Sequence, residues 1–316
     1  MLRGILVYNP IAGRYPSRLL AERAADVLRQ NDWQLSLEQS QSSEHITQLA
    51  QQAAREGMDG FFMAGGDGSL NFAVAGLTGS KTALGVLPSG TANVWAQELG
   101  LPGLSWTRWM ALEESARQLA SATPYLVDIG LCNDRPFLLW AGVGLDAFVV
   151  HHIEPRSRWE KHFAFVHYAA SVAWHSSFWH GMNLRVETDG QQILGHFLLA
   201  LVSNVHLYAG GLANLSPNAR LDDGKMDLWL FEGETLGDTV QLAWDLLAGR
   251  HVQSQRVRSL EFRNLRLESD SPAYVQVDGE PVDVINPVTI STQPKALYVL
   301  VPPGTPQPLF SSGGNL

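Results

Sequence analysis

The sequence predicts an α/β domain followed by a second domain of antiparallel β structure. Strand and helix signals alternate over the first third of the chain, whereas short apolar runs separated by turn residues dominate the rest. Glycine-containing loops also follow three apolar strands of the first part. Because alternating strands and helices favour a parallel sheet with covering helices, we expect an open α/β fold there.

The first domain is predicted over residues 1–125. Its strand segments are short and apolar, and its helical segments repeat apolar residues at helical spacing. In chain order, we expect strands at 4–8, 33–40, 60–66 and 82–90 and helices at 17–31, 44–57, 70–77 and 91–100.

The second domain is predicted over residues 126–301. The β-rich runs lie at 135–144, 182–204, 225–233 and 265–282, and helical patches lie at 159–177 and 235–250. The tail at 302–316 is rich in Pro, Gly and Ser and could return to the first domain.

Composition and charge exclude several classes of protein. The net charge of −9 argues against a nucleic-acid partner, since phosphate backbones require a clustered positive surface. The single cysteine, Cys132, excludes an intramolecular disulfide and fits a cytoplasmic protein. The N-terminus lacks a signal-peptide pattern, and no apolar run reaches the roughly 18 residues of a membrane span. Any membrane contact is therefore expected to be peripheral.

Three loops carry the strongest functional signal. They are NPIAG at 9–13, GGDGS at 65–69 and PSGTAN at 88–93, and each leads from an apolar strand into a helix. Glycine lets backbone amides approach a phosphate, and helix N-termini favour anions. Asp67 indicates a metal or a polar nucleotide group there. These loops predict a nucleotide site, although ordinary turns of an α/β fold remain the alternative.

These loops, together with GVGLDA (142–147), LDDGKMDL (221–228) and VQVDGEP (275–281), resemble the diacylglycerol kinase catalytic family. That family includes bacterial lipid kinases and the sphingosine and ceramide kinases. The resemblance covers nearly the whole chain in the same order. It implies a phosphofructokinase-like (Rossmann-like) nucleotide domain followed by an antiparallel β-sandwich, with the active site in the interdomain cleft.

The same resemblance implies an ATP site and its residues. The residues expected to line it are Asn9, Pro10, Ala12, Gly13, Ser40, Gly65, Gly66, Asp67, Gly68, Ser69, Asn71, Gly90, Thr91 and Asn93.

Two acidic turns in the second half are candidates for the chemistry. Asp278 and Glu280 flank a glycine after an apolar strand, and the resemblance implies that this pair supplies the proton acceptor. Glu280 is the favoured base with Asp278 as its partner, and the reverse assignment stays open. The resemblance also implies a structural Mg²⁺ on the Asp223 carboxylate and the carbonyls of Arg220 and Lys225. ATP brings a further Mg²⁺, for which Asp67 is the nearest candidate ligand.

The chain departs from the family at two acidic positions. Phe72 and Val94 stand where most relatives carry a carboxylate. The segment 151–181 combines histidine, tryptophan and basic residues, which suits a membrane interface, although a core-packing helix explains it equally well.

The leading hypothesis is an ATP- and Mg²⁺-dependent lipid kinase acting on a diacylglycerol-like or sphingoid-like hydroxyl at a membrane surface. A soluble-metabolite kinase of the NAD kinase type is one alternative, although NPIAG and the late DGE fit the lipid branch better. A nucleotide-binding regulatory protein without catalysis is another, suggested by Phe72 and Val94. A homodimer is compatible with the sequence, which does not identify the acceptor.

Overall fold

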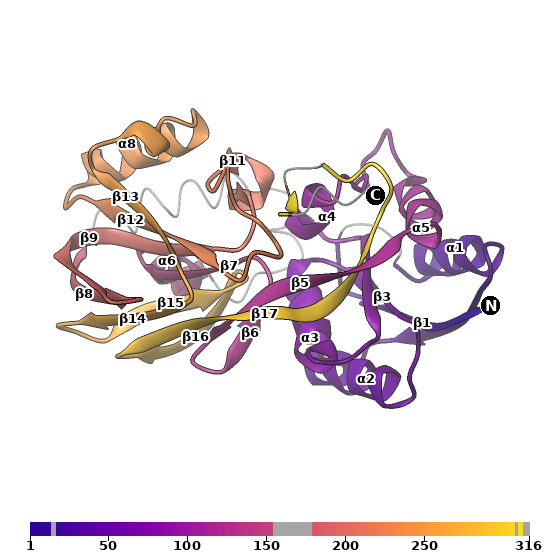
Figure 1. Cartoon of the computed structure of the whole chain (residues 1–316). Helices are drawn as coiled ribbons and strands as arrows, with labels where there is room; N and C mark the ends of the chain where they lie inside the picture. Colours follow the sequence, from indigo (N-terminus) through magenta and orange to yellow (C-terminus); the bar gives the residue numbers. More distant parts are fainter. Residues whose placement is uncertain (14–16, 154–178, 307–308, 312–316) are drawn as a thin grey trace. The chain divides into compact units, whose positions relative to one another are not determined.

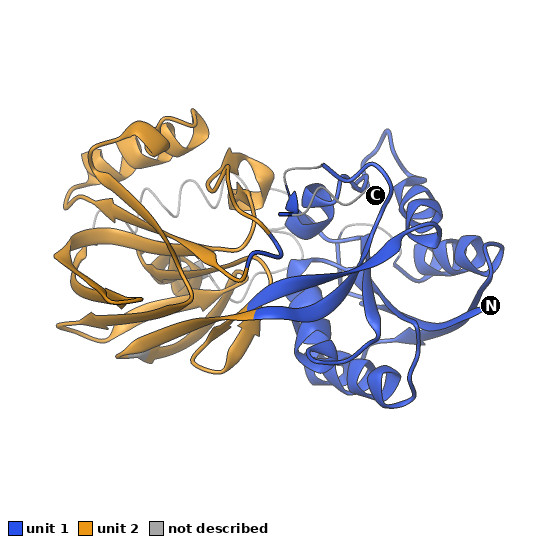
Figure 2. Cartoon of the chain, viewed as in Figure 1, with its two compact units in different colours: residues 1–129, 221–223, 294–316 blue, residues 130–220, 224–293 orange. Residues whose placement is uncertain are grey.

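The chain folds into two compact units, each described here by itself. The structure is a computed structural model and describes residues 1–13, 17–153, 179–306 and 309–311. Unit 1 comprises 1–129, 221–223 and 294–316, and unit 2 comprises 130–220 and 224–293 (Figure 2).

Unit 1 is built on a parallel sheet with the strand order β2-β1-β3-β4-β17. Helices α1 and α5 pack against each other, as do α2 and α3 (Figure 1). The strands are β1 (Leu2–Tyr8), β2 (Trp33–Gln39), β3 (Gly60–Gly65), β4 (Ala83–Pro88) and the last part of β17 (Val288–Val301). The helices are α1 (Ser17–Arg29), α2 (Ser43–Arg55), α3 (Asp67–Leu77), α4 (Val94–Glu98) and α5 (Ala111–Ala120).

The predicted alternation of strands and helices is confirmed. Every residue of β3 and of β4 is buried, as a strand covered on both faces requires. Helix α2 begins after Ser42, whose hydroxyl accepts the His45 amide at 3.1 Å, an ordinary N-cap. Helix α5 lies in a segment for which the sequence predicted no element.

Later parts of the chain complete unit 1. The Asp128 amide donates to the Leu221 carbonyl at 2.6 Å, and the Leu221 amide donates to the Leu309 carbonyl at 2.9 Å. The Asp128 carboxylate accepts the Lys295 amide at 2.7 Å. Unit 1 is therefore assembled from three separate stretches of sequence.

Unit 2 is antiparallel, as the sequence predicted. Its strands follow the order β16-β15-β7-β9-β8-β14-β17, and β12 pairs with both β9 and β13. An apolar core includes Phe137, Phe197 and Phe262. The strands are β6 (Arg135–Phe137), β7 (Trp140–Gly144), β8 (Met182–Thr188), β9 (Gln191–Ser203), β10 (Leu207–Tyr208), β11 (Ala213–Asn214), β12 (Met226–Glu232), β13 (Val257–Phe262), β14 (Asn264–Ser269), β15 (Ala273–Val277), β16 (Glu280–Ile285) and the first part of β17; β10 and β11 form a separate antiparallel pair. Strand β5 (Thr123–Cys132) ends in this unit and pairs with β6.

Unit 2 also carries the helices α6 (Leu145–Ile153) and α8 (Leu236–Leu247). The helix predicted at 235–250 is confirmed by α8. The whole predicted helical patch at 159–177, and most of the proposed membrane-facing segment 151–181, lie outside the described residues. Among the residues that are described, no helix is long and apolar enough to cross a bilayer.

A reciprocal cap at the start of α8 gives a test of stability. The Thr235 hydroxyl accepts the Asp238 amide at 3.2 Å, and the Asp238 carboxylate accepts the Thr235 amide at 3.0 Å. The hydrogen bond from the Thr235 hydroxyl, followed by those from the Glu234 and Thr235 amides, holds the pKa of Asp238 well below its ordinary value. This contribution is present above the unfolded pKa of about 3.9 and is lost as the pH falls further.

We expect Thr235→Ala to lower the free energy of unfolding by about 1 kcal/mol near neutral pH. Urea denaturation followed by tryptophan fluorescence measures the change. The difference from wild type should shrink as the pH falls below about 4, because Asp238 then becomes protonated in the unfolded chain. A difference that stays constant with pH would contradict the assigned cause.

Candidate active site

The first two predicted loops of unit 1 are joined at the end of the sheet. Asn9 follows β1, and its Nδ2 donates to the Ser69 hydroxyl in the first turn of α3 at 2.8 Å. The Asn9 carboxamide oxygen accepts the Ile11 amide at 3.0 Å, and the Ala12 amide donates to the Asn9 carbonyl at 3.1 Å. The NPIAG segment is thereby folded back as a compact turn beside GGDGS.

Gly13 brings the first loop against the third. Its φ is +63°, and a Cβ built there would lie 1.9 Å from the Ser89 carbonyl oxygen. A side chain is excluded both by the left-handed conformation and by backbone that cannot move aside. Ser89, which the sequence did not single out, therefore sets how closely the two loops approach.

We expect Gly13→Ala to weaken binding of the predicted ATP at least about tenfold, because the added Cβ would push the Ser89 backbone, and with it the third loop, away from the first. Titration calorimetry with ATP measures the affinity. Gly79→Ala is the matched control, because Gly79 has φ +76° and an added Cβ would meet nothing within 4 Å. Equal ATP affinities in the two variants would contradict a role for the close approach.

The second and third loops also meet through glycine. A Cβ on Gly90 would lie 2.5 Å from the Gly66 Cα. The Gly90 amide donates to the Asn93 side-chain oxygen at 2.9 Å, and Asn93 Nδ2 donates to the Gly90 carbonyl at 3.0 Å. Asn93 has φ +54°, a conformation that asparagine tolerates better than most residues. PSGTAN is thus a tight turn pressed against GGDGS.

Asp67 ties GGDGS to the helix after PSGTAN. Its two carboxylate oxygens accept the amides of Val94 at 2.9 Å and Trp95 at 3.2 Å. Burial raises the pKa of the Asp67 carboxyl above its ordinary value, against the lowering effect of those two amides. Asp67 therefore caps the first turn of α4. A cation bound there would use the carboxylate lone pairs that the two amides do not occupy.

The other predicted nucleotide residues occupy the same three loops and the neighbouring strand end. Ser40 follows β2, is buried, and donates its amide to the Tyr8 carbonyl at 2.9 Å. Thr91 is exposed. Asn71 is buried on α3, and its carboxamide oxygen has no hydrogen-bond partner among the described atoms. The glycine cradle fits a bound phosphate-bearing group, whereas the Asn71 oxygen is an acceptor and would suit a hydrogen-bond donor of a ligand. Pro10, Gly65 and Gly68 lie within the joined loops.

The predicted acidic pair lies on a two-residue hairpin in unit 2. Asp278 and Gly279 have φ of +49° and +82°, and Val277 pairs with Glu280 across the turn. The Asp278 carboxylate is buried and accepts three backbone amides, those of residues 138, 139 and 140, at 2.9–3.0 Å. Glu280 is half-buried at the start of β16. The two carboxylates therefore have different environments.

The residues predicted for a structural Mg²⁺ lie on the segment before β12. Asp223 belongs to unit 1, whereas Arg220 and Lys225 belong to unit 2. Gly224 turns the chain with φ +76°. Lys225 Nζ lies 2.6 Å from Glu261 Oε2. No group of three His, Cys, Asp or Glu side chains suited to a metal occurs within the described part of the chain. The predicted set consists of one carboxylate and two backbone carbonyls, so it is not a group of that kind. Its oxygen donors suit Mg²⁺.

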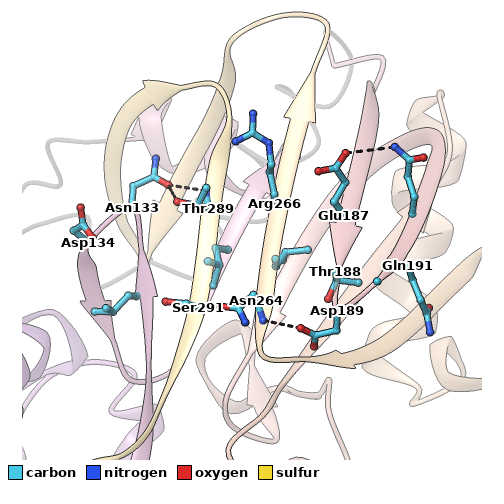
Figure 3. Close-up of a pocket in the computed structure, with 15 residues that line it drawn as sticks. Asn133, Asp134, Glu187, Thr188, Asp189, Gln191, Asn264, Arg266, Thr289 and Ser291 are labelled. Atoms are coloured by element: carbon cyan, nitrogen blue, oxygen red, sulfur yellow. Dashed lines mark hydrogen bonds between the residues drawn. The ribbon is translucent and has the colours of Figure 1, made fainter.

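A separate hollow of about 650 Å³ lies in unit 2. Figure 3 shows it between strands β8, β14 and β17, with Asn133 bonded to Thr289 on one side and Asp189 near Asn264 on the other. None of the site residues predicted from the sequence lines it. The hollow therefore stands apart from the candidate catalytic groups.

Comparison with known proteins identifies the family. Residues 3–130 match the model of the diacylglycerol kinase catalytic domain, and residues 140–301 match that of the YegS C-terminal NAD kinase beta sandwich-like domain. The chain belongs to the diacylglycerol kinase family. It is therefore an enzyme of the lipid kinase class, a phosphotransferase with an alcohol group as acceptor, and the resemblance inferred from the sequence is confirmed.

Similar proteins agree with this family. The diacylglycerol kinase of Bacillus subtilis (strain 168) is 26% identical over 285 residues, covering 89% of this chain and 90% of the relative. A protein of Chromohalobacter salexigens named "Probable lipid kinase YegS-like" is 30% identical over 262 residues, covering 81% of this kinase and 80% of the relative.

A solved structure agrees on the fold of this kinase. The crystal structure of a diacylglycerol kinase from Bacillus anthracis str. Sterne matches with a TM-score of 0.71 at 18% identity, covering 96% of this chain and 98% of that one. The predicted fold class, an α/β nucleotide-type domain followed by an antiparallel β-sandwich, is confirmed.

Proposed function

We propose that this lipid kinase transfers the γ-phosphate of ATP, with Mg²⁺, to the hydroxyl of a diacylglycerol-like or sphingoid-like lipid. The observation that carries the proposal is the joining of three glycine-containing loops at the ends of β1, β3 and β4. Ligands of open α/β sheets bind beyond the carboxyl ends of the strands, where backbone amides are available to phosphate.

In this proposal, unit 1 holds the nucleotide. The residues assigned to it are those predicted from the sequence, on the NPIAG, GGDGS and PSGTAN loops and at Ser40. The close approaches at Gly13 and Gly90 keep side chains away from the loop surface, so that a triphosphate meets backbone donors. Mg²⁺ bound with ATP would neutralise charge that develops on the transferred group.

Glu280 is the proposed proton acceptor for the lipid hydroxyl. A general base must offer a carboxylate oxygen to the acceptor, and Glu280 is half-buried at the edge of its hairpin. The Asp278 oxygens already accept three amides inside the unit. We therefore assign Asp278 to holding the turn and Glu280 to the chemistry. Asp223, with the carbonyls of Arg220 and Lys225, is proposed for a structural Mg²⁺.

The acceptor is proposed to be presented at a membrane surface, with the enzyme in the cytoplasm and bound peripherally. Two relatives support a lipid acceptor through their names, diacylglycerol kinase and YegS-like lipid kinase. The NAD kinase-like description of the second domain keeps a soluble acceptor as the competing candidate. A nucleotide-binding protein that has lost catalysis is the other.

The test is transfer of label from γ-labelled ATP. Purified protein is incubated with Mg²⁺ and mixed micelles of diacylglycerol, sphingosine or ceramide, and with NAD as the soluble acceptor. Label in the organic phase that depends on Glu280 is the expected result. Label on NAD alone would overturn the lipid assignment. ATP that raises the melting temperature without any transfer would favour the regulatory alternative.

A further inference from the structure

The base of the DGE hairpin rests on a buried polar pair, Gln276 and Asp146, to which the sequence motifs gave no individual role. Gln276 is 1% exposed on β15, between Val275 and Val277, which belong to the apolar core. Because side chains alternate along a strand, Gln276 points to the opposite face from these valines. Helix α6 packs against β15, β16 and β7, and Asp146 lies in its first turn.

Gln276 connects that helix to the turn. Its Nε2 donates to Asp146 Oδ2 at 2.6 Å, and its Oε1 accepts the Gly279 amide at 2.8 Å. Asp146 itself is 8% exposed. The Gly279 amide belongs to the peptide immediately after Asp278, and Gly279 is bonded directly to Glu280. Any rotation of that turn must therefore break a charge-assisted network within the unit.

The chain leaves room for this pair. Gly142 on β7 pairs with Gln276, and a Cβ built on it would lie 2.6 Å from Asp146 Oδ2 and 2.7 Å from Gln276 Nε2. Any larger residue would force the two side chains apart. The absence of a side chain at Gly142 therefore leaves the space that the hydrogen bond between Gln276 and Asp146 occupies. Apolar side chains alone would not require such a bond.

We infer that Gln276 and Asp146 are positioning residues, which fix the Asp278–Gly279 turn and thereby the direction of the Glu280 carboxylate. The inference rests on the proposed role of Glu280. Neither residue is assigned contact with a substrate. Their effect would be on kcat, since small misplacements of a catalytic group cost rate more than they cost binding.

Gln276→Met tests the inference because methionine keeps the size of the side chain and removes both hydrogen bonds. We expect kcat for diacylglycerol in mixed micelles to fall about tenfold or more, with the KM for ATP unchanged. Asp146→Asn keeps an acceptor for Gln276 and should retain most of the rate, whereas Asp146→Leu should behave like Gln276→Met. Gly142→Ala should also lower kcat. The double variant Gly142→Ala/Gln276→Met should lose little more rate than either single variant.

Hydrogen exchange provides a readout that does not need turnover. The peptide containing Gly279 should exchange at least about tenfold faster in Gln276→Met and Asp146→Leu than in wild type, and close to the wild-type rate in Asp146→Asn. Gln192→Met, at an exposed glutamine of β9, is the matched control and should change neither readout.

Unchanged exchange and unchanged kcat in Gln276→Met would overturn the inference. Failure of the proposed function would look different. If Glu280→Gln keeps wild-type transfer, Glu280 is not the base, whatever Gln276→Met does. Faster exchange at Gly279 without a change in kcat would show that the pair holds the turn but does not position the catalytic group, which also contradicts the inference.

Discussion

Glu280→Gln is expected to lower kcat by about 10²–10⁴-fold, the usual contribution of a general base. The carboxamide has nearly the shape of the carboxylate but cannot accept the proton of a lipid hydroxyl at neutral pH. ATP affinity should remain at the wild-type value, because the residues assigned to the nucleotide belong to unit 1 and Glu280 belongs to unit 2. Transfer from γ-labelled ATP and calorimetric titration with ATP measure the two quantities.

Asp283→Asn is the matched control for that variant. Asp283 is an exposed residue of the same strand, three positions along, so it makes the same chemical change on β16 without touching the turn. Its kcat should stay within about twofold of wild type, as expected for surface substitutions. Equal losses in the two variants would show that negative charge on β16, and not the proton acceptor, is what matters.

Asp278→Asn should destabilise unit 2 and reduce turnover together. The carboxylate accepts three buried amides, and the carboxamide can accept at only one of its two polar atoms. At least one amide is then left without a partner and faces an NH₂ group. We expect a loss of about 1–3 kcal/mol in the free energy of unfolding, measured by urea denaturation.

A second Asp-Gly hairpin in the same unit supplies the control. Asp189 and Gly190 form the turn between β8 and β9 with φ of +41° and +87°, and Asp189 also accepts backbone amides, from Arg263 and Asn264. Asp189 is exposed, so water can replace any hydrogen bond that an amide side chain loses there. Asp189→Asn should cost less than about 0.5 kcal/mol. Similar losses at both turns would refute the explanation by burial.

The three loops of unit 1 were predictable because their signals are local. Each of these glycine-containing loops follows an apolar strand and precedes a helix, and the chain order alone places them at one edge of a parallel sheet. Their mutual contacts were not predictable in detail. Nothing in NPIAG reveals that Gly13 faces the Ser89 carbonyl, since that contact joins residues 76 positions apart.

The two acidic residues of the DGE turn illustrate a different limit. In the sequence, Glu280 is favoured over Asp278 only narrowly, because an Asp-Gly turn places both on a hairpin. Only the partners from residues 138–140 distinguish them. Gln276 could have been noticed as a lone polar residue in an otherwise apolar strand, AYVQV, but its link to Asp146 spans 130 positions.

The division of the chain was hard to place for a related reason. Pro- and Gly-rich composition suggested that the chain returns to the first domain at residue 302. In the structure, unit 1 already includes the chain from Pro294 onward. That crossing occurs inside β17, a continuous strand from Val288 to Val301. Pro294 and the left-handed Lys295 (φ +49°) mark the crossing, but a single proline inside a strand is a weak boundary signal in a sequence.

The sharing of β17 has a consequence for synthesis on the ribosome. β4 pairs with β17 along one side and with β3 along the other, so its outer edge has no partner until the last strand has been made. A nascent chain carrying only residues 1–129 therefore presents an open parallel edge, the kind of edge that recruits other chains. We expect that fragment to aggregate when expressed alone, and the native sheet of unit 1 to close only after β17 has been translated.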